Sequence, residues 1–207
     1  MLLIRHGQID ANVSKHWHGS TDSPLNAVGV AQVERLATHV ASEHGDVRAI
    51  YASPLQRTLH TAEGPGRRLR LPVASVPELR EWGIGELEGT HYEALAREHR
   101  FFERIAREPD FAPPGGESLA AVAARMEDAL RAIARRHPEE TVAVVSHGMA
   151  LALALARLLH DDAAHWHRFR IDNCSITELH LPVAPATPEL ARVNWIEHLA
   201  PSADATG

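Results

Sequence analysis

Short apolar runs alternate along the chain with longer segments in which apolar residues recur every three or four positions. Apolar or β-branched runs occupy positions 2–4, 47–52, 73–76 and 141–145. Runs of this kind are typical of strands buried in a parallel sheet, and the spacing that follows most of them is typical of amphipathic helices. Strands that alternate with helices predict a three-layer α/β sandwich, in which helices cover both faces of a mainly parallel central sheet.

Capping residues, prolines and glycines indicate where the first two helices begin and end. Asn26 is expected to cap a helix that stops at Gly45. Ser53 followed by Pro54 predicts the start of a second helix, because proline is favoured at the first helical position. The Gly-Pro-Gly sequence at 64–66 is expected to end that helix.

The middle of the chain predicts a loop and then a helix. The acidic, glycine-rich segment PELREWGIGELEGT predicts an irregular loop. Thr90 and Glu93 then form a capping box for a helix that is expected to run to about Arg107.

The last part of the chain predicts two more helices and further strands. A long amphipathic helix is expected to begin at position 117 or 118 and to stop at Pro138. An alanine- and leucine-rich helix follows the strand at 141–145 and runs to about His160. Later strands are expected at 169–172, 175–181 and 191–196.

The overall composition indicates one domain and disfavours several classes of partner. The 207 residues, 44% of them apolar, are enough for one core, so we expect a single domain over residues 1–200 and a flexible tail at 201–207. A formal net charge of −6 disfavours nucleic acid and anionic membranes as partners. Cys174 is the only cysteine, which excludes an internal disulfide.

Neither a secretory signal nor a membrane span is expected. The first apolar run ends at Arg5 and is shorter than the about 7–15 residues of a signal peptide core. The longest apolar stretch is broken by Arg157 and falls below the roughly 20 residues that a membrane helix needs. We therefore expect a cytoplasmic protein.

Histidines and arginines follow three of the predicted strands. Arg-His-Gly at 5–7 follows the first strand, Ser-His-Gly at 146–148 follows a later one, and Arg57 lies in the first turns of a helix that follows another. Taken singly, each could be an ordinary surface ion-pair partner or a strand-end histidine. If the three strands are neighbours, however, two histidines and two arginines meet at the carboxyl edge of the sheet, where ligands bind and helix N-termini favour anions.

This set of side chains suits phosphoryl transfer. A neutral imidazole can attack phosphorus and form a phosphohistidine, while arginine forks hold the phosphoryl oxygens and stabilise the transition state. The arginines would also lower the pKa of the histidine and keep it unprotonated at neutral pH. The leaving alkoxide needs a proton, and the acidic loop offers four candidate donors, Glu78, Glu81, Glu86 and Glu88.

Five segments in a fixed order carry a resemblance to a known family. They are RHG at the end of the first strand, SPLQRTLHTA, LREWGIGELEG, PPGGES, and SHG at the end of a late strand. Together they resemble the histidine phosphatase superfamily, in the branch related to cofactor-dependent phosphoglycerate mutase. The resemblance extends from Leu2 through the NWIEHL segment, and it implies a phosphoglycerate mutase-like fold.

The resemblance implies a role for each matched residue. His6 is implied as the nucleophile, Glu81 as the proton donor, and His147 as a second histidine that binds phosphate and stabilises the transition state. Further phosphate ligands are implied at Arg5, Arg57 and Gly148, and substrate-binding residues at Gln8, Asn12 and Gly19. The resemblance implies no metal and no cofactor, because arginine and histidine supply the positive charge.

The family contains both mutases and phosphatases, and the sequence favours a phosphatase. Mutases of this type carry longer, basic insertions around the substrate carboxylate, whereas the segment between Glu88 and Gly116 is short here and has no second arginine pair in a proline-rich insert. We therefore expect hydrolysis of phosphate monoesters of a small metabolite. Phosphoryl transfer of the mutase type is the first alternative.

Two alternatives come from other classes of function. One is a non-catalytic module that binds a phosphorylated ligand on the same fold. The other is a metal-dependent hydrolase that uses the histidine pairs His16 with His18 and His165 with His167, although neither pair has a carboxylate or cysteine at ligand spacing. Strands near the C-terminus could pair two copies into a homodimer, and no feature of the sequence requires it.

Overall fold

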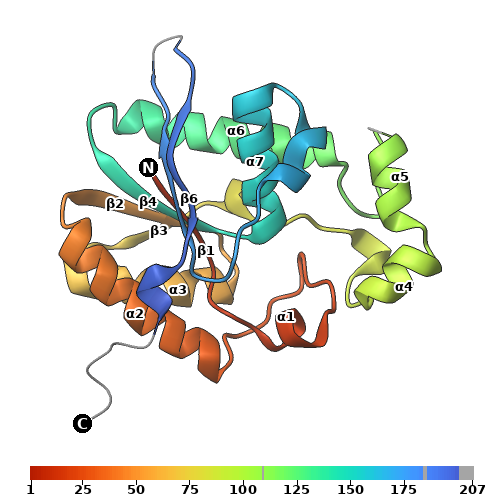
Figure 1. Ribbon diagram of the computed structural model, residues 1–207, viewed down its shortest axis with the longest axis horizontal. Coiled ribbons are helices and arrows are strands. Elements are labelled where there is room, and N and C mark those ends of the chain that lie inside the picture. The colour runs from red at the N-terminus through yellow and green to blue at the C-terminus, as the bar shows by residue number, and fades with distance from the viewer. Residues whose placement is uncertain (109, 184–185, 201–207) are drawn as a thin grey trace.

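The computed structural model describes residues 1–108, 110–183 and 186–200, and a six-stranded sheet forms its centre (Figure 1). The strand order is β3-β2-β4-β1-β5-β6. The first four of these strands run parallel, whereas β5 pairs antiparallel with both β1 and β6. The strands are β1 (Leu2–Arg5), β2 (Val47–Ala52), β3 (Val73–Ser75), β4 (Thr141–Ser146), β5 (Ile176–His180) and β6 (Glu189–Trp195).

Helices cover both faces of the sheet, as predicted. In one layer α2 packs on α3, and in the other α6 packs on α7. The short helices α4 and α5 lie to one side of these layers (green, at the right of Figure 1). The helices are α1 (Asp10–Ser14), α2 (Ala27–Glu43), α3 (Gln56–Leu69), α4 (Tyr92–Arg97), α5 (Phe101–Arg107), α6 (Leu119–Arg136) and α7 (Gly148–His160). Short 3₁₀ helices are η1 (Pro77–Leu79), η2 (Gly85–Leu87), η3 (Ala163–Arg168) and η4 (Glu197–Leu199).

The central strand β4 shows why a continuous β-branched run is needed. Val142 and Val144 pack into the core on the α6–α7 side, while Ala143 and Val145 pack into the core on the α2–α3 side. Successive side chains of a strand point to opposite faces, so a strand with a helical layer on each face must be apolar throughout. Each fully buried valine contributes roughly 1.5–3 kcal/mol, and these contributions fix β4 between β1 and β2.

Several predicted element boundaries are confirmed. The Asn26 side chain caps α2 by accepting the Gly29 N–H at 2.9 Å. Ser118 caps α6 by accepting the Ala121 N–H at 3.2 Å. The loop predicted after β3 is irregular apart from η1 and η2. The tail predicted at 201–207 lies outside the described residues.

The prediction that Gly-Pro-Gly at 64–66 ends a helix is wrong. Helix α3 continues through all three residues to Leu69, and they are buried. The reason is tertiary: a Cβ on Gly64 would lie 2.6 Å from Cγ1 of Val33 on α2. The missing side chain lets α2 and α3 approach closely, and the packing outweighs the low helix propensity of glycine and proline.

Three other local predictions also need correction. Helix α3 begins at Gln56, and Ser53 instead directs its hydroxyl to His147 at 2.8 Å. The helix expected from Thr90 to Arg107 is split into α4 and α5, because Arg100 between them takes a left-handed φ of 47°. His91, in place of Thr90, caps α4.

The segment 169–172 forms no strand in the described part of the chain. The Ile171 carbonyl accepts a hydrogen bond from the Arg5 guanidinium at 2.7 Å. In a strand the same carbonyl would instead bond to the backbone of a neighbouring strand. Among the residues that the structure covers, no helix has both the length and the apolar character that crossing a membrane requires.

We predict that Gly64→Val lowers the free energy of unfolding by about 1–3 kcal/mol, the usual effect of overpacking a core. Helix propensity hardly differs between the two residues, so the loss reports the α2–α3 contact. Urea unfolding measures it. The matched control is Gly45→Val, at an exposed glycine whose Cβ would have only an ordinary contact of 3.5 Å. Equal stabilities of the two variants would contradict the packing explanation.

Candidate active site

A cavity of about 330 Å³ opens at the carboxyl ends of β1 and β4. Its polar end is lined by Arg5, His6, Asn12, Glu81 and Gly148. The three strands β2, β4 and β1 are adjacent and parallel, so the predicted convergence of the segments that follow them is confirmed.

The His6 imidazole is held in one tautomer. Its Nδ1 lies 2.7 Å from the Gly7 carbonyl oxygen, and a carbonyl only accepts, so Nδ1 carries the proton and donates. The other nitrogen, Nε2, is therefore unprotonated and has a free lone pair. The side chain is only 3% exposed, and its ring faces that of His147 with centroids 5.2 Å apart at 63°.

Burial and two arginines keep both histidines neutral. Burial is the largest cause that lowers the pKa of His6 well below its ordinary value, and the charges of Arg5 and Arg57 lower it further. Burial likewise lowers the pKa of His147, followed by the charge of Arg57. Both rings are therefore unprotonated at neutral pH, which is the state a nucleophilic imidazole requires.

Arg5 has unused hydrogen-bonding capacity. Its Nη1 donates to the Ile171 carbonyl at 2.7 Å, while its Nε is buried and has no partner among the described residues. A Cβ on Gly148 would lie 3.3 Å from the Arg5 Cζ, so any side chain there would press on the guanidinium where helix α7 begins. An unpartnered buried donor beside an open cavity is suited to an anionic ligand.

Arg57 lies behind the cavity and is fully buried. Its Nη1 donates to the Thr21 carbonyl at 2.7 Å, and its Nη2 donates to the carbonyls of Gly19 at 2.8 Å and His18 at 3.2 Å. Its Nε donates to Nδ1 of His147 at 3.3 Å. The guanidinium therefore holds the loop 18–21 and acts on the two histidines through its charge.

Glu88 fixes the other side of the same loop, a role that sequence analysis did not identify. Its carboxylate accepts the backbone N–H groups of Gly19 at 2.9 Å and Ser20 at 3.1 Å, and the Thr21 hydroxyl at 3.1 Å. The loop thus directs its N–H groups to Glu88 and its carbonyls to Arg57. The GELEG sequence marked Glu88 only as an acid in a loop.

His147 is held between two partners. Nδ1 accepts from Arg57, so Nε2 carries the proton and donates to the Ser53 hydroxyl at 2.8 Å. The residue occupies the N-cap position of α7 without a side-chain capping hydrogen bond and is fully buried. It therefore lies beside His6 and behind the wall of the cavity.

Glu81 is bound to the first turn of α7. Its Oε1 accepts the N–H groups of Trp82 at 2.9 Å and Ala150 at 2.8 Å, and its Oε2 accepts the N–H of Met149 at 3.2 Å. A carboxyl group is favoured at a helix N-terminus, where backbone N–H groups lack helical partners. Glu81 is thereby fixed at the polar end of the cavity.

A partly buried ion pair holds the backbone of Glu81, and sequence analysis did not identify it either. Arg125 pairs with Glu117 at 2.8 and 2.9 Å. The same guanidinium donates to the carbonyls of Glu78 and Arg80 at 2.8 Å and of Glu81 at 3.0 Å. In the sequence, the signals for this ion pair are the glutamate of PPGGES, Glu117, and the arginine eight residues after it, Arg125.

The three predicted substrate-binding residues lie in different places. Asn12 lines the cavity. The Gln8 side chain accepts from the Asn26 amide at 3.0 Å, away from the cavity. Gly19 lies between Glu88 and Arg57, so its backbone serves the loop.

The histidine pairs considered for a metal lie apart. His16 and His18 line the cavity, whereas His165 and His167 lie in η3. The described part of the chain contains no group of three or more histidine, cysteine or acidic side chains that could hold a metal ion.

Comparisons with known proteins bear on the family and the fold of the chain. A family model described as the histidine phosphatase superfamily (branch 1) matches residues 1–196. The chain is 35% identical over 187 residues to the protein of Proteus mirabilis (strain HI4320) named "Probable phosphoglycerate mutase GpmB", a match covering 89% of this chain and 86% of that protein. It is 32% identical over 185 residues to the "Metal-independent phosphoserine phosphatase" of Arabidopsis thaliana, covering 87% and 76%.

A solved structure shares the whole fold. Phosphoserine phosphatase from Entamoeba histolytica, in complex with 3-phosphoglyceric acid, matches with a TM-score of 0.85 and 26% identity, covering 96% of this chain and 98% of that chain. The predicted phosphoglycerate mutase-like α/β fold is therefore confirmed.

We predict that the two neutral histidines make stability fall in mild acid. In the unfolded chain an imidazole takes up a proton as the pH falls through about 6.5, but the buried rings have a lower pKa when folded. Below that pH the unfolded state binds more protons, so the free energy of unfolding falls by up to about 1.4 kcal/mol per pH unit for each ring.

Urea unfolding of the wild type and of His6→Gln between about pH 8 and pH 5 tests this linkage. Below pH 6.5 the free energy of unfolding of the variant should fall less steeply with pH than that of the wild type, because one titrating histidine is gone. Above about pH 7.5 the difference in free energy of unfolding between the two proteins should stay constant. Parallel stability curves down to pH 5 would show that His6 titrates equally in the folded and unfolded chain.

Proposed function

This chain belongs to the histidine phosphatase superfamily, and on that premise we propose that it hydrolyses phosphate monoesters of small molecules through a phosphohistidine on His6. One observation carries the proposal. The His6 ring is neutral, oriented by the Gly7 carbonyl, and lines a cavity beside the unpartnered Nε of Arg5. A positioned imidazole lone pair and a buried cation together suit attack on a phosphoryl group.

In the first step, Nε2 of His6 attacks phosphorus and the bond from phosphorus to the ester oxygen breaks. An N–P bond forms, and the leaving oxygen takes a proton from the Glu81 carboxyl group. The hydrogen bond from Nδ1 to the Gly7 carbonyl stabilises the positive charge that develops on the imidazole. Glu81 is suited to its part because the α7 N-terminus holds it at the same end of the cavity.

In the second step, water attacks the phosphohistidine and Glu81, now ionised, takes the proton from that water. The N–P bond breaks, phosphate leaves, and both side chains return to their starting states. The acid of the first step thus becomes the base of the second. Arg5, Arg57 and the N-terminus of α7 supply the positive potential that spreading phosphoryl charge requires, with the neutral His147 ring packed beside His6, so the reaction as proposed needs no metal.

Hydrolysis is favoured over a phosphoglycerate mutase reaction by the charge of the cavity. A mutase must also bind the carboxylate of its substrate and keep water away from the phosphoenzyme. Arg5 is the one arginine or lysine among the described residues that line the cavity, and its charge is needed for the phosphoryl group. We assign the enzyme to the cytoplasm as part of the same proposal.

We predict that His6→Ala lowers kcat/KM for p-nitrophenyl phosphate at least about a thousandfold, because the covalent route is lost. Rapid quenching of the wild type in base should reveal a phosphoenzyme that is lost on acidification, and the variant should form none. His60→Ala, at an exposed histidine on α3, is the matched control and should retain full activity. Turnover by His6→Ala, or loss of wild-type turnover after dialysis against EDTA, would favour the alternative of a metal-dependent hydrolase.

We predict that the effect of Glu81→Gln depends on the leaving group. A positioned general acid contributes about 10²–10⁴-fold for alkyl phosphates, whose alkoxides are strongly basic. For p-nitrophenyl phosphate the loss should be below about tenfold, because nitrophenolate scarcely needs a proton. Steady-state kcat/KM on both esters gives the ratio. Glu86→Gln, at an exposed position of the same loop, should change neither rate, and equal losses on both esters would remove Glu81 from the role of acid.

A further inference from the structure

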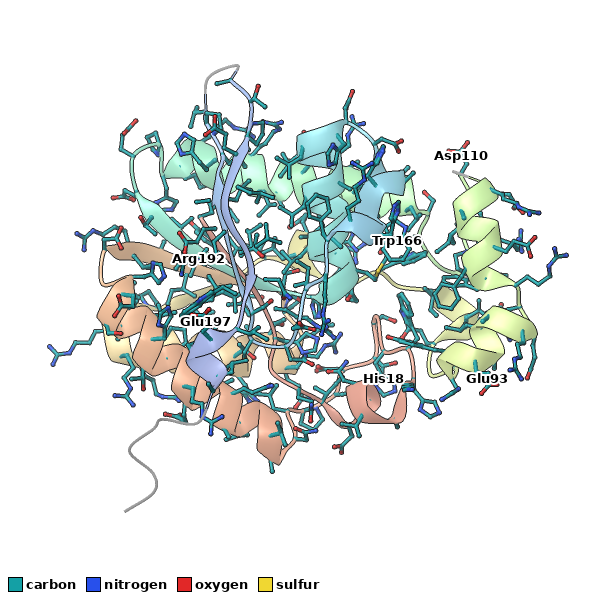
Figure 2. All side chains as sticks on the ribbon, viewed as in Figure 1. His18, Glu93, Asp110, Trp166, Arg192 and Glu197 are labelled. Atoms are coloured by element: carbon teal, nitrogen blue, oxygen red, sulfur yellow. The ribbon has the colours of Figure 1, made fainter. Side chains whose placement is uncertain are left out.

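Five aromatic side chains line the same cavity as His6. These rings, the aromatic wall, belong to Trp17, Tyr92, Phe102, Trp166 and Phe169. They come from separate parts of the chain: the segment after α1, the helices α4 and α5, and η3 with the residue that follows it. Figure 2 labels Trp166 on η3 and His18 near the opposite rim, and both line the cavity.

The aromatic wall is a built surface whose rings support one another. The Tyr92 ring lies 5.7 Å from Trp17 and 6.5 Å from Phe102, measured between centroids. The Trp17 indole N–H donates to the Trp82 carbonyl at 3.3 Å, which fixes the angle of that ring. Burial raises the pKa of Tyr92 above its ordinary value, so this part of the wall stays uncharged at neutral pH.

Arg5 is the one arginine or lysine among the described residues that line the cavity, and its charge is needed for the phosphoryl group. Two cations of nearby segments have other partners: Arg104 lies 3.7 Å over the Phe111 ring and pairs with Glu108, and Arg170 pairs with Asp172 at 2.9 Å. A carboxylate or a second phosphate of a bound ligand would therefore lose water against aromatic rings without gaining a counter-ion, which is strongly unfavourable.

We propose, on the premise of the phosphatase function above, that the preferred substrates are phosphate monoesters of uncharged apolar or aromatic alcohols. The phosphoryl group binds at Arg5 and His6, and the organic group packs on the aromatic wall. Monoesters that carry a carboxylate or a second phosphate are discriminated against. A cavity of about 330 Å³ lies at the small end of the usual range for ligand sites, which fits a single ring or a short chain.

A series of n-alkyl phosphates from methyl to hexyl tests the proposal. Their leaving alcohols have nearly equal basicity, so differences in kcat/KM report burial of the chain. We expect a rise of about three- to fourfold per methylene until the cavity is full. Butyl phosphate should also exceed its carboxylated analogue, 4-(phosphonooxy)butanoate, at least about tenfold, because the added carboxylate has no counter-ion. A flat series, or equal rates for this pair, overturns the proposal.

Variants of the aromatic wall assign the preference to it. Trp166→Ala should reduce the dependence on chain length, whereas Trp195→Ala, which removes an indole packed on His39 at the far side of the sheet, should leave it unchanged. Phe102→Arg should raise kcat/KM for 4-(phosphonooxy)butanoate and lower it for butyl phosphate. A gain of activity on the carboxylated ester cannot come from misfolding, so it would support the proposal directly. An unchanged kcat/KM for that ester in Phe102→Arg would contradict the role of the aromatic wall.

Binding without turnover separates this proposal from the phosphatase function. Calorimetry with butylphosphonate and 4-phosphonobutanoate needs no hydrolysis, and the uncharged chain should bind at least about tenfold more tightly. If no monoester is hydrolysed but this order of affinity holds, the proposed reaction is wrong, whereas the binding preference assigned to the aromatic wall is confirmed. If esters are hydrolysed while the carboxylated ligands bind equally or better, the substrate class alone is wrong.

Discussion

The guanidinium of Arg57 is fully buried, so its N–H donors need hydrogen-bond acceptors inside the protein. This requirement determines much of the arrangement of the candidate active site. Removing a charge from water costs several kcal/mol unless hydrogen bonds replace the lost solvent. Here the carbonyls of the loop 18–21 and Nδ1 of His147 replace it. Because the carbonyls of this loop face Arg57, its N–H groups face the opposite side, where the Glu88 carboxylate accepts their hydrogen bonds. One buried cation therefore orders the loop, and the loop in turn contributes His18 to the rim of the cavity.

The same requirement gives the two histidines their chemical state. Burial disfavours a charged imidazole, and Arg57 on one side and Arg5 on the other repel a further positive charge, so the imidazoles stay neutral. A phosphate dianion is attracted by this potential, whereas protons are excluded. The arrangement suits a nucleophile that must keep its lone pair, and it makes the folded chain less stable where free imidazole would be protonated. Reactivity and acid sensitivity have the same physical cause.

Local sequence patterns predict the strands that carry the chemistry, because burial on both faces demands β-branched runs and because histidine and glycine directly follow two of them. The patterns do not predict contacts between distant positions. Arg57 meets Gly19 across 38 positions, and Gly19 meets Glu88 across 69. Nothing beside Glu88 in the sequence distinguishes it from an exposed acid. At Gly64 the local pattern makes a wrong prediction. Glycine and proline indicate a helix end, but the close contact with Val33 keeps the helix intact.

The chemical groups and the aromatic wall rest on different parts of the fold, and this division bears on how specificity arises. His6 and His147 follow adjacent core strands, and Glu81 is fastened to the helix that begins beside His147, so their relative positions depend on the sheet. The rings of the wall come largely from α4, α5 and η3, outside the two helical layers. On the proposed function, changes on these elements would alter the organic group that fits without moving the phosphoryl site. On this division of labour, a family that retains one reaction can act on different alcohols, because a change such as Phe102 to a cation leaves the buried histidines and Arg57 untouched.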